Sequence, residues 1–438
     1  MIELMYEKLD KAEWGRYHWQ LFIIVSLNYF LDGIMFSIAP LLAYLIVSPD
    51  FAALIFAINL LAETMGAIVF GYLADLLGRK LLFMTSLAIE AASLIVLVLT
   101  YHNPIALLIL TSMMTFGIGG EFGASYAAIA ELSPSKHRGK ALMLATNFWN
   151  IGSAVIAGLA ILYATISSDP TTQINYLLGT ALATALVVGI ARLGFPESPR
   201  WLVIRGRIEE AIRLVEQITG AKLREKASQM HATRQEQNLI GLRTALTKYW
   251  FRFVVLAIVT ISQYVTYDVT AYYLPYAKGF LFPADLIPLF IFIANLGASI
   301  GAFLLLPLID KARRVSLVLA FLGGLLTAYL ILIAHNYQHM LFFEDALLVN
   351  LVFSEWAWAG LSVLQSELFP TGVRATVVGL LTGLQGIAGT LIVYLESLMS
   401  VNEFFMLILV LWGLGLLAAL SWYVKGVESA GESLEKLV

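Results

Sequence analysis

Twelve apolar stretches, each long enough to cross a lipid bilayer, follow one another along this 438-residue chain. A helix needs about 20 mostly apolar residues to span a hydrocarbon core of about 30 Å. With 60% hydrophobic and 13% charged residues, the chain is too apolar for a soluble protein of this length. We therefore predict an all-α membrane protein with twelve transmembrane helices. The expected spans are residues 19–47, 51–74, 81–101, 104–130, 141–166, 175–194, 250–277, 285–309, 315–335, 346–368, 374–397 and 402–424.

An internal repeat divides the chain into two related halves. The pattern Glu-Leu-x-Pro-x-x-x-Arg begins at residue 131 and again at residue 367, an offset of 236 positions. The same offset places Asp32 on Asp268, and such polar matches are unexpected by chance in an apolar background. Two halves of like orientation imply a pseudo-two-fold axis along the membrane normal and a central site between them.

The halves are expected to be separate bundles joined by a polar linker. We predict an N-terminal six-helix bundle over residues 1–194, a linker over 195–249 and a C-terminal six-helix bundle over 250–438. Apolar residues recur at helical spacing in 208–218, which indicates an amphipathic helix. All Lys and Arg residues except Lys278 fall on one side of the predicted spans, so both termini are expected in the cytoplasm of a multi-pass cell-membrane protein.

Composition argues against several kinds of chemistry. The chain has no Cys, and its six His residues lack ligand spacing, so no metal site is expected. Neither a cofactor motif nor a nucleophile–base set is apparent, which argues against an enzyme. The net charge of −3 gives no reason to expect a nucleic-acid partner. The expected partners are the lipid bilayer, a small-molecule substrate and protons, and the expected state is a monomer.

Four motifs resemble those of the major facilitator superfamily, in the branch that holds sugar porters, organic-cation transporters and metabolite symporters. They are the loop 71–80 (GYLADLLGRK), the repeated Glu-Leu-x-Pro-x-x-x-Arg pattern, the string 196–202 (PESPRWL), and 263–273, which ends in paired tyrosines. The resemblance implies alternating access between two bundles. Two departures concern sugar specificity: Asp268 stands where sugar porters have Asn, and their closing Pro-Glu-Thr string is missing.

The resemblance also implies charge networks that hold the cytoplasmic side shut. Carboxylates and guanidinium groups at span ends can pair when that side closes and separate when it opens, although one interfacial pair alone contributes little. The alternative is that the cations only enforce topology. The predicted gating residues are Asp75, Arg79, Lys80, Glu131, Arg138, Asp310, Arg314, Glu367 and Arg374.

Acidic residues inside the apolar spans are the strongest functional candidates. An ionised side chain at mid-span costs at least ~2.5 kcal/mol, so each such residue is a functional candidate by default. No Lys or Arg is expected at comparable depth. Glu90 is expected at a peripheral packing or lipid-facing position, and the role of Glu63 is left open. The six acids are Asp32, Glu63, Glu90, Glu121, Asp268 and Glu355.

Four of these acids lie on spans that, by the resemblance, line a central cavity: the first, fourth, seventh and tenth. A buried carboxyl group that takes up a proton on one side and releases it on the other suits a proton-coupled symporter. We predict that Asp32, Glu121 and Asp268 couple protons. The alternative for Asp32 and Asp268 is hydrogen bonding between helices. The span-four Arg that partners the acid at Asp32 in proton–sugar symporters of this family is absent here.

Amide and aromatic side chains crowd the same spans and suit an organic solute. Amides bind hydroxyl groups, and aromatic faces stack on sugars or hold cations. The predicted substrate-binding residues are Asn147, Asn150, Gln263, Tyr267, Tyr272, Glu355, Trp358 and Gln385. Without a cation at the site an anionic substrate is disfavoured. We expect a proton-coupled symporter of a sugar-like or other neutral solute. The alternatives are an organic-cation or drug transporter and a non-transporting sensor; a channel is disfavoured by the duplicated halves.

Overall fold

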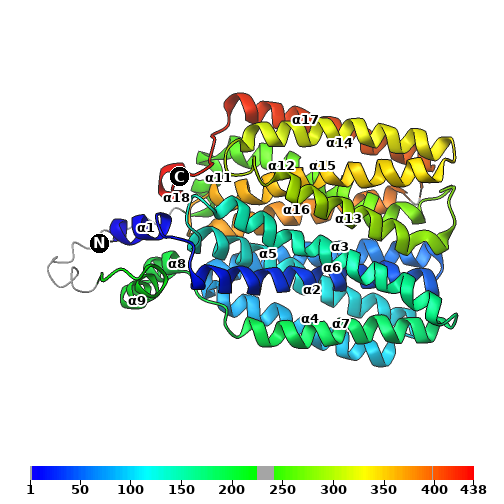
Figure 1. The fold of residues 1–438 in the computed structure, drawn as a ribbon, viewed down its shortest axis with the longest axis horizontal. Helices are drawn as coiled ribbons and strands as arrows, with labels where there is room; N and C mark the ends of the chain where they lie inside the picture. The colour runs from blue at the N-terminus through cyan, green and yellow to red at the C-terminus, as the bar shows by residue number, and fades with distance from the viewer. Residues whose placement is uncertain (1, 224–240, 397) are drawn as a thin grey trace.

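The computed structural model describes residues 2–223, 241–396 and 398–438, and all regular structure in these residues is helical (Figure 1). Twelve helical segments are long and apolar enough to cross a membrane, which confirms the predicted number. The spans are α2 (Arg16–Ile46), α3 (Pro49–Leu77), α4 (Arg79–Thr100), α5 (Pro104–Leu132), α6 (Arg138–Ile166), α7 (Pro170–Arg192), the composite α12/η1/η2 (Trp250–Tyr276), η3/α13 (Ala284–Leu305), α14 (Arg313–Asn336), α15 (Met340–Glu367), α16 (Arg374–Glu396) and α17 (Val401–Lys425).

Local capping chemistry decides where several spans begin. α3, α5 and α7 each start with a Ser, Asn or Asp cap followed by Pro, whose fixed φ and missing N–H suit the first helical position. Asp169 accepts a hydrogen bond of 2.9 Å from the backbone N–H of Thr172. This cap starts α7 at Pro170, five residues before the predicted 175, because polar residues in the first turn hide the start from an apolar-run count.

The two halves pack in the same pattern. In the first half α2 packs on α6 and α7, and α5 packs on α3 and α4. In the second half the counterparts α12 on α16 and α17, and α15 on α13 and α14, are in contact as well. Between the halves, α3 packs on α16 and α6 on α13, two contacts that a two-fold axis exchanges. The packing is that of two six-helix bundles related by a pseudo-two-fold axis.

Glycines allow the closest of these contacts. A Cβ added at Gly119 on α5 would collide with the backbone carbonyl of Glu63 on α3. Gly379 on α16 lies in the same way against the carbonyl of Ala67, across the interface between the halves. Small residues at such crossings let helix backbones approach in a membrane, where packing supplies much of the attraction.

The seventh span contains the main irregularity. α12 (Trp250–Tyr264) continues as η1, a π-helix over Val265–Tyr273, and ends in a 3₁₀ turn, η2 (Leu274–Tyr276). π-helical segments are rare and occur frequently at functional sites. Tyr267 and Asp268 belong to this segment, and both are buried.

Both termini lie at one end of the bundle, here called the terminus face (Figure 1). Short helices cover this face: α1 (Ile2–Asp10), α8 (Pro199–Ile204), α9 (Ile208–Thr219), α11 (Leu242–Lys248) and α18 (Leu434–Leu437). α9 is the predicted amphipathic helix. It buries Ala211, Ile212, Val215 and Ile218, and it packs against α1 and α8. Residues 224–240 of the predicted linker lie outside the described residues.

Candidate functional site

A central cavity lies between the two halves. Its volume is about 30 Å³, which is enough for water but smaller than the usual sites for small ligands. The lining residues come from α2, α3, α5 and α6 of one half and from α12, η1 and α15 of the other, and they include no Lys or Arg. They are Tyr29, Glu63, Phe122, Thr146, Trp149, Asn150, Gln263, Tyr264, Tyr267, Asp268, Glu355 and Trp358.

A hydrogen-bond network joins the halves along one wall of the cavity. Asn150 donates to Glu355 at 2.8 Å, and the Tyr267 hydroxyl lies 2.7 Å from the Asn150 amide oxygen. The same hydroxyl lies 2.8 Å from the amide oxygen of Asn295 on α13. On another wall Tyr264 donates to Glu63 at 2.6 Å, so a second link joins α12 to α3.

Several polar atoms around the cavity have unused hydrogen-bonding capacity. Buried polar groups normally have a partner, so such atoms mark places where a solute or water can bind. Within the described residues, the buried side-chain atoms without a hydrogen-bond partner include Glu63 Oε1, Gln263 Oε1, Asp268 Oδ2 and Glu355 Oε1. The cavity therefore offers carboxyl and amide groups beside aromatic faces.

Five of the eight predicted substrate-binding residues line this cavity, and three lie behind its walls. Asn147 bonds to Asn150 at 3.0 Å and to Ser299 at 3.3 Å. Tyr272 donates to Ser153 at 2.9 Å, and Gln385 is buried on α16. Sequence reasoning assigned no binding role to Phe122 or Thr146, although Thr146 shares a helix face with Trp149 and Asn150.

Of the predicted proton-coupling acids, Asp268 lines the cavity, whereas Asp32 and Glu121 lie behind it. Glu121 and Phe122 are neighbours on α5, so when Phe122 faces the cavity Glu121 is turned toward α4 and α7. There Arg192 Nη2 lies 2.5 Å from Glu121 Oε1, both side chains fully buried. The expectation of no basic group at this depth is wrong, because the long Arg192 side chain reaches inward from the end of α7.

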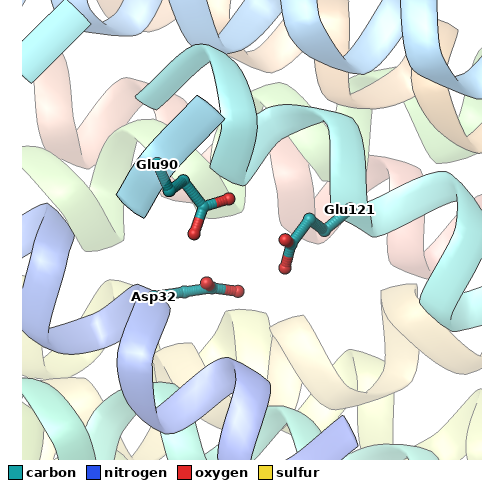
Figure 2. A group of neighbouring side chains, drawn as sticks. All are labelled: Asp32, Glu90 and Glu121. Atoms are coloured by element: carbon teal, nitrogen blue, oxygen red, sulfur yellow. The ribbon is translucent and has the colours of Figure 1, made fainter. Parts of the chain in front are cut away.

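Of the two positions expected for Glu90, packing or lipid-facing, the lipid-facing one is wrong. Glu90 is fully buried on α4 and lies beside Asp32 and Glu121, not at a lipid-facing position (Figure 2). Asn28 on α2 donates to Asp32 at 2.9 Å and also to Glu121. A group of acids from three helices thus forms inside the first half, next to the cavity wall.

Buried ion pairs join the halves below the cavity, at the terminus face. Arg79 lies 3.0 Å from Asp75 and 3.2 Å from Glu131. Glu131 also pairs across the interface with Arg374 at 2.7 Å. Asp75 accepts two hydrogen bonds of 2.7 Å, from the backbone N–H and the hydroxyl of Thr376. The network therefore ties the end of α3 to the start of α16.

A second network repeats this arrangement in the other half, with Arg313 in the place predicted for Arg314. Arg313 pairs with Glu367 and lies 3.2 Å from Asp310. Arg138 reaches across the interface to Glu367 at 3.8 Å. The prediction of Arg314 is wrong by one residue: it is half-buried and stacks over Tyr423, since α14 begins with Arg313 facing inward.

Lys80 does not belong to the first network, because its side chain is exposed and only its backbone N–H bonds to Glu197. Sequence reasoning also missed Asp10, which lies 2.8 Å from Arg138 and 3.1 Å from Arg200. Burial disfavours the charged form of Arg200, but Glu435 and Asp10 outweigh this effect and raise the pKa of Arg200 above its usual range.

Aromatic side chains close the opposite end of the cavity. Phe56 on α3 stacks on Tyr273, with ring centroids 4.5 Å apart. The Tyr276 hydroxyl donates to the backbone carbonyl of Pro40 at 2.6 Å. The cavity thus lies between ion networks at the terminus face and an aromatic contact at the other face.

Known proteins are similar to this chain over about half of its length or more. A family model described as "Sugar (and other) transporter" matches residues 35–438. The inner membrane metabolite transport protein YgcS of Escherichia coli (strain K12) is 28% identical over 388 residues, which cover 86% of this chain and 84% of that protein. The niacin transporter NiaP of Acinetobacter baylyi is 29% identical over 216 residues, 48% of each chain.

The solved structures confirm the fold. The structure of the proton:xylose symporter XylE bound to 6-bromo-6-deoxy-D-glucose superposes with a TM-score of 0.80 at 20% sequence identity, covering 96% of this chain and 98% of XylE. At this identity the likeness shows the architecture of two six-helix bundles, and it leaves the residues of the cavity to be interpreted from their own chemistry.

Proposed function

Because the chain belongs to the Sugar (and other) transporter family of the major facilitator superfamily, we propose that it is a proton-coupled symporter of a small, neutral, sugar-like solute. The observation that carries this proposal is the central cavity, which both halves line with amide, carboxyl and aromatic groups. Amide and carboxyl groups bind hydroxyls, and the buried acids can exchange protons. The similarity to a proton:xylose symporter supports the same assignment.

Alternating access follows from the contacts that close the cavity. The ion networks at the terminus face join the two halves, and the aromatic contact joins them at the other face. In the proposed cycle one set separates while the other remains closed. The bias of Lys and Arg supports an orientation with the terminus face in the cytoplasm. We propose a multi-pass protein of the cell membrane that acts as a monomer.

One observation favours a second candidate, an organic cation. Glu63, Asp268 and Glu355 line the cavity together with six aromatic side chains, and no basic residue is among the lining residues. Carboxylates beside aromatic faces are a common way to hold a cation. In this case the substrate charge, rather than a proton, would neutralise an acid.

Uptake into proteoliposomes with an imposed pH gradient tests the proposal, with a panel of sugars and polyols compared with a panel of organic cations. We expect a sugar-like solute to accumulate above its external concentration only when the gradient is present. Accumulation of cations alone would favour the second candidate. Absence of uptake across both panels, in protein whose fold is verified, would argue for a non-transporting sensor.

Two substitutions then separate coupling from binding. Asp32→Asn is expected to abolish gradient-driven accumulation while solute exchange continues. The coupling role is wrong if accumulation persists in this variant. Asp268→Asn is expected to weaken solute affinity more than Asp75→Asn does, because Asp268 lines the cavity and Asp75 lies at the terminus face. Equal effects would mean that both residues only support folding.

A further inference from the structure

Four buried ionisable side chains from four helices meet inside the first half. Asp32 of α2, Glu90 of α4 and Glu121 of α5 each offer a carboxylate oxygen, and these oxygens lie within 4.8 Å of one another. Figure 2 shows the three carboxyl groups turned toward one another. Arg192 of α7 completes the group, with Nη2 2.5 Å from Glu121 Oε1. All four side chains are fully buried.

The charges of this group do not balance if every acid is ionised. One guanidinium offsets one carboxylate, which leaves two uncompensated carboxylates in a fully buried site, at a high desolvation cost. Glu90 is fully buried and points into the group, yet within the described residues neither of its oxygens has a hydrogen-bond partner. Within the same described residues, Asp32 Oδ1 also lacks a hydrogen-bond partner. A protonated carboxyl can donate to a neighbouring carboxylate, whereas an ionised one cannot.

We infer that Asp32, Glu90, Glu121 and Arg192 form one proton-binding unit, in which Arg192 offsets one carboxylate and about two protons are shared among the three carboxyl groups. The inference rests on the proposed function, because it assigns the site of the coupled proton. Arg192 is a positioning residue that sets how many protons the unit holds. It supplies from α7 the positive charge that no Lys or Arg of α5 provides.

Neighbouring groups fix the geometry of the unit without adding charge. Ser86 of α4 donates to Glu121 at 2.6 Å and accepts from Arg192 at 3.3 Å. The Arg192 guanidinium also donates to the backbone carbonyl of Phe83 at 2.5 Å. The nearby titratable groups on α2 and α5, Tyr29 and Tyr126, are phenols, which are neutral near pH 7.

The proton-binding unit lies directly behind two residues that line the cavity. Asn28 bonds both Asp32 and Glu121, and the next residue on each helix, Tyr29 and Phe122, lines the cavity. A shift of α2 against α5 on solute binding would therefore change the separation of the carboxyl groups. The number of protons that the carboxyl groups share depends on that separation, so solute binding and proton release are linked in this unit.

Infrared spectroscopy of the full-length protein in detergent at pH 7 tests the inference, with protonated carboxyl groups counted by their carbonyl stretching band. If the unit holds about two protons, Glu90→Gln and Asp32→Asn should each remove about half of its band intensity. Arg192→Gln should increase the intensity by about half, since three carboxyl groups without a cation need three protons. Arg192→Lys should retain the intensity of the unsubstituted protein.

A double variant and two controls complete the experiment. Arg192→Gln combined with Glu90→Gln should return the band to the unsubstituted intensity. Glu355→Gln tests a buried acid outside the unit, and its change should be the same with or without Arg192. Asp345→Asn, an exposed acid on α15, should change nothing.

The inference is overturned if Glu90→Gln and Asp32→Asn leave the band unchanged, or if the protein at pH 7 shows no such band from the unit, as fully ionised acids around a bound metal ion would. If Arg192→Gln fails to fold, Arg192→Lys and Glu90→Gln decide the matter. The proton count does not depend on transport. Expected infrared changes without gradient-driven uptake would therefore reject the proposed coupling and keep the proton-binding unit.

Discussion

At the scale of single residues, the Tyr267 hydroxyl lies within hydrogen-bonding distance of two amide oxygens. It lies 2.7 Å from the Asn150 amide oxygen and 2.8 Å from that of Asn295. A hydroxyl carries one proton, so Tyr267 can donate to only one of these oxygens at a time. When Tyr267 donates to Asn295, the amide oxygen of Asn150, which lines the cavity, is available to a solute hydroxyl. The Asn295 oxygen also accepts from the Tyr272 hydroxyl at 3.1 Å. One side chain thereby joins the π-helix to both halves and leaves an acceptor open in the cavity.

Tyr267→Phe is expected to raise the KM for uptake of the solute found by the panel about tenfold, a loss of about 1.4 kcal/mol. The substitution removes the hydroxyl donor, so the buried amide oxygens of Asn150 and Asn295 lose the hydrogen bond that Tyr267 gives to one or the other. Tyr163→Phe is the matched control, because its hydroxyl bonds Thr180 at 2.9 Å between α6 and α7, away from the cavity. Equal KM values for both variants would contradict a role of Tyr267 at the site.

The sequence predicts which residue types occur at the site more readily than it predicts the directions in which their side chains point. The acids of the spans stand out against an apolar background, and Asp268, Glu355 and Asn150 do line the cavity. Glu121 does not, because one step along a helix turns a side chain by about 100°. Arg192 was missed for a related reason: a count of apolar residues places it at the membrane edge and does not show where its long side chain ends.

At the scale of helices, the networks at the terminus face bring together the ends of four spans. Arg79 at the start of α4 contacts Asp75 of α3 and Glu131 of α5, and Glu131 contacts Arg374 of α16. Removing one member of a buried ion pair leaves a charge uncompensated, at a cost of about 3–5 kcal/mol. That cost falls only on the closed arrangement, so it favours separation of the halves at this face.

Arg79→Gln is therefore expected to open the terminus face toward the cavity. The chain has no Cys, so a single Thr146→Cys substitution reports cavity access through its reaction with a membrane-impermeant thiol reagent. We expect labelling of this Cys to be at least about tenfold faster with Arg79→Gln, since a shift of 1.4 kcal/mol is enough for that change. Lys80→Gln, the adjacent and exposed residue, should leave the labelling rate unchanged. Faster labelling in both variants would mean that loss of charge, not loss of the network, opens the face.

Helix number and arrangement were accessible from the sequence because apolar length and a 236-residue repeat both have direct physical causes. The π-helix over Val265–Tyr273 was not. Its residues read as an ordinary continuation of an apolar span, and in the structure this segment packs against α13 and α16. An apolar-run count finds the span but does not report the helix type within it.

At the scale of the whole molecule, the two ends of the chain connect the halves at the terminus face. Asp10, the last residue of α1, lies between Arg138 of α6 and Arg200 of α8. Arg200 also pairs with Glu435 in the C-terminal segment at 3.0 Å. The same segment accepts a hydrogen bond of 2.6 Å from Arg252 of α12, at the carbonyl of Leu437. The described termini thus bridge the first bundle to the second.

Asp10→Asn is expected to lower the free energy of unfolding by about 1.5–3 kcal/mol, as for a lost hydrogen bond to a charged group. Because α1 also ties the closed face together, thiol labelling of Thr146→Cys should become faster in this variant. Thermal unfolding in detergent measures the first effect, and the reagent used for Arg79→Gln measures the second.

Glu7→Gln provides the matched control on the same helix. Glu7 is exposed and pairs with Lys11 at 2.6 Å, so its substitution should leave both the unfolding midpoint and the labelling rate unchanged. A lower midpoint for Asp10→Asn with unchanged labelling would mean that α1 stabilises the fold without taking part in closure. Unchanged values for both measurements would contradict the bridging role of Asp10, because two buried arginines would then have lost a shared partner without consequence.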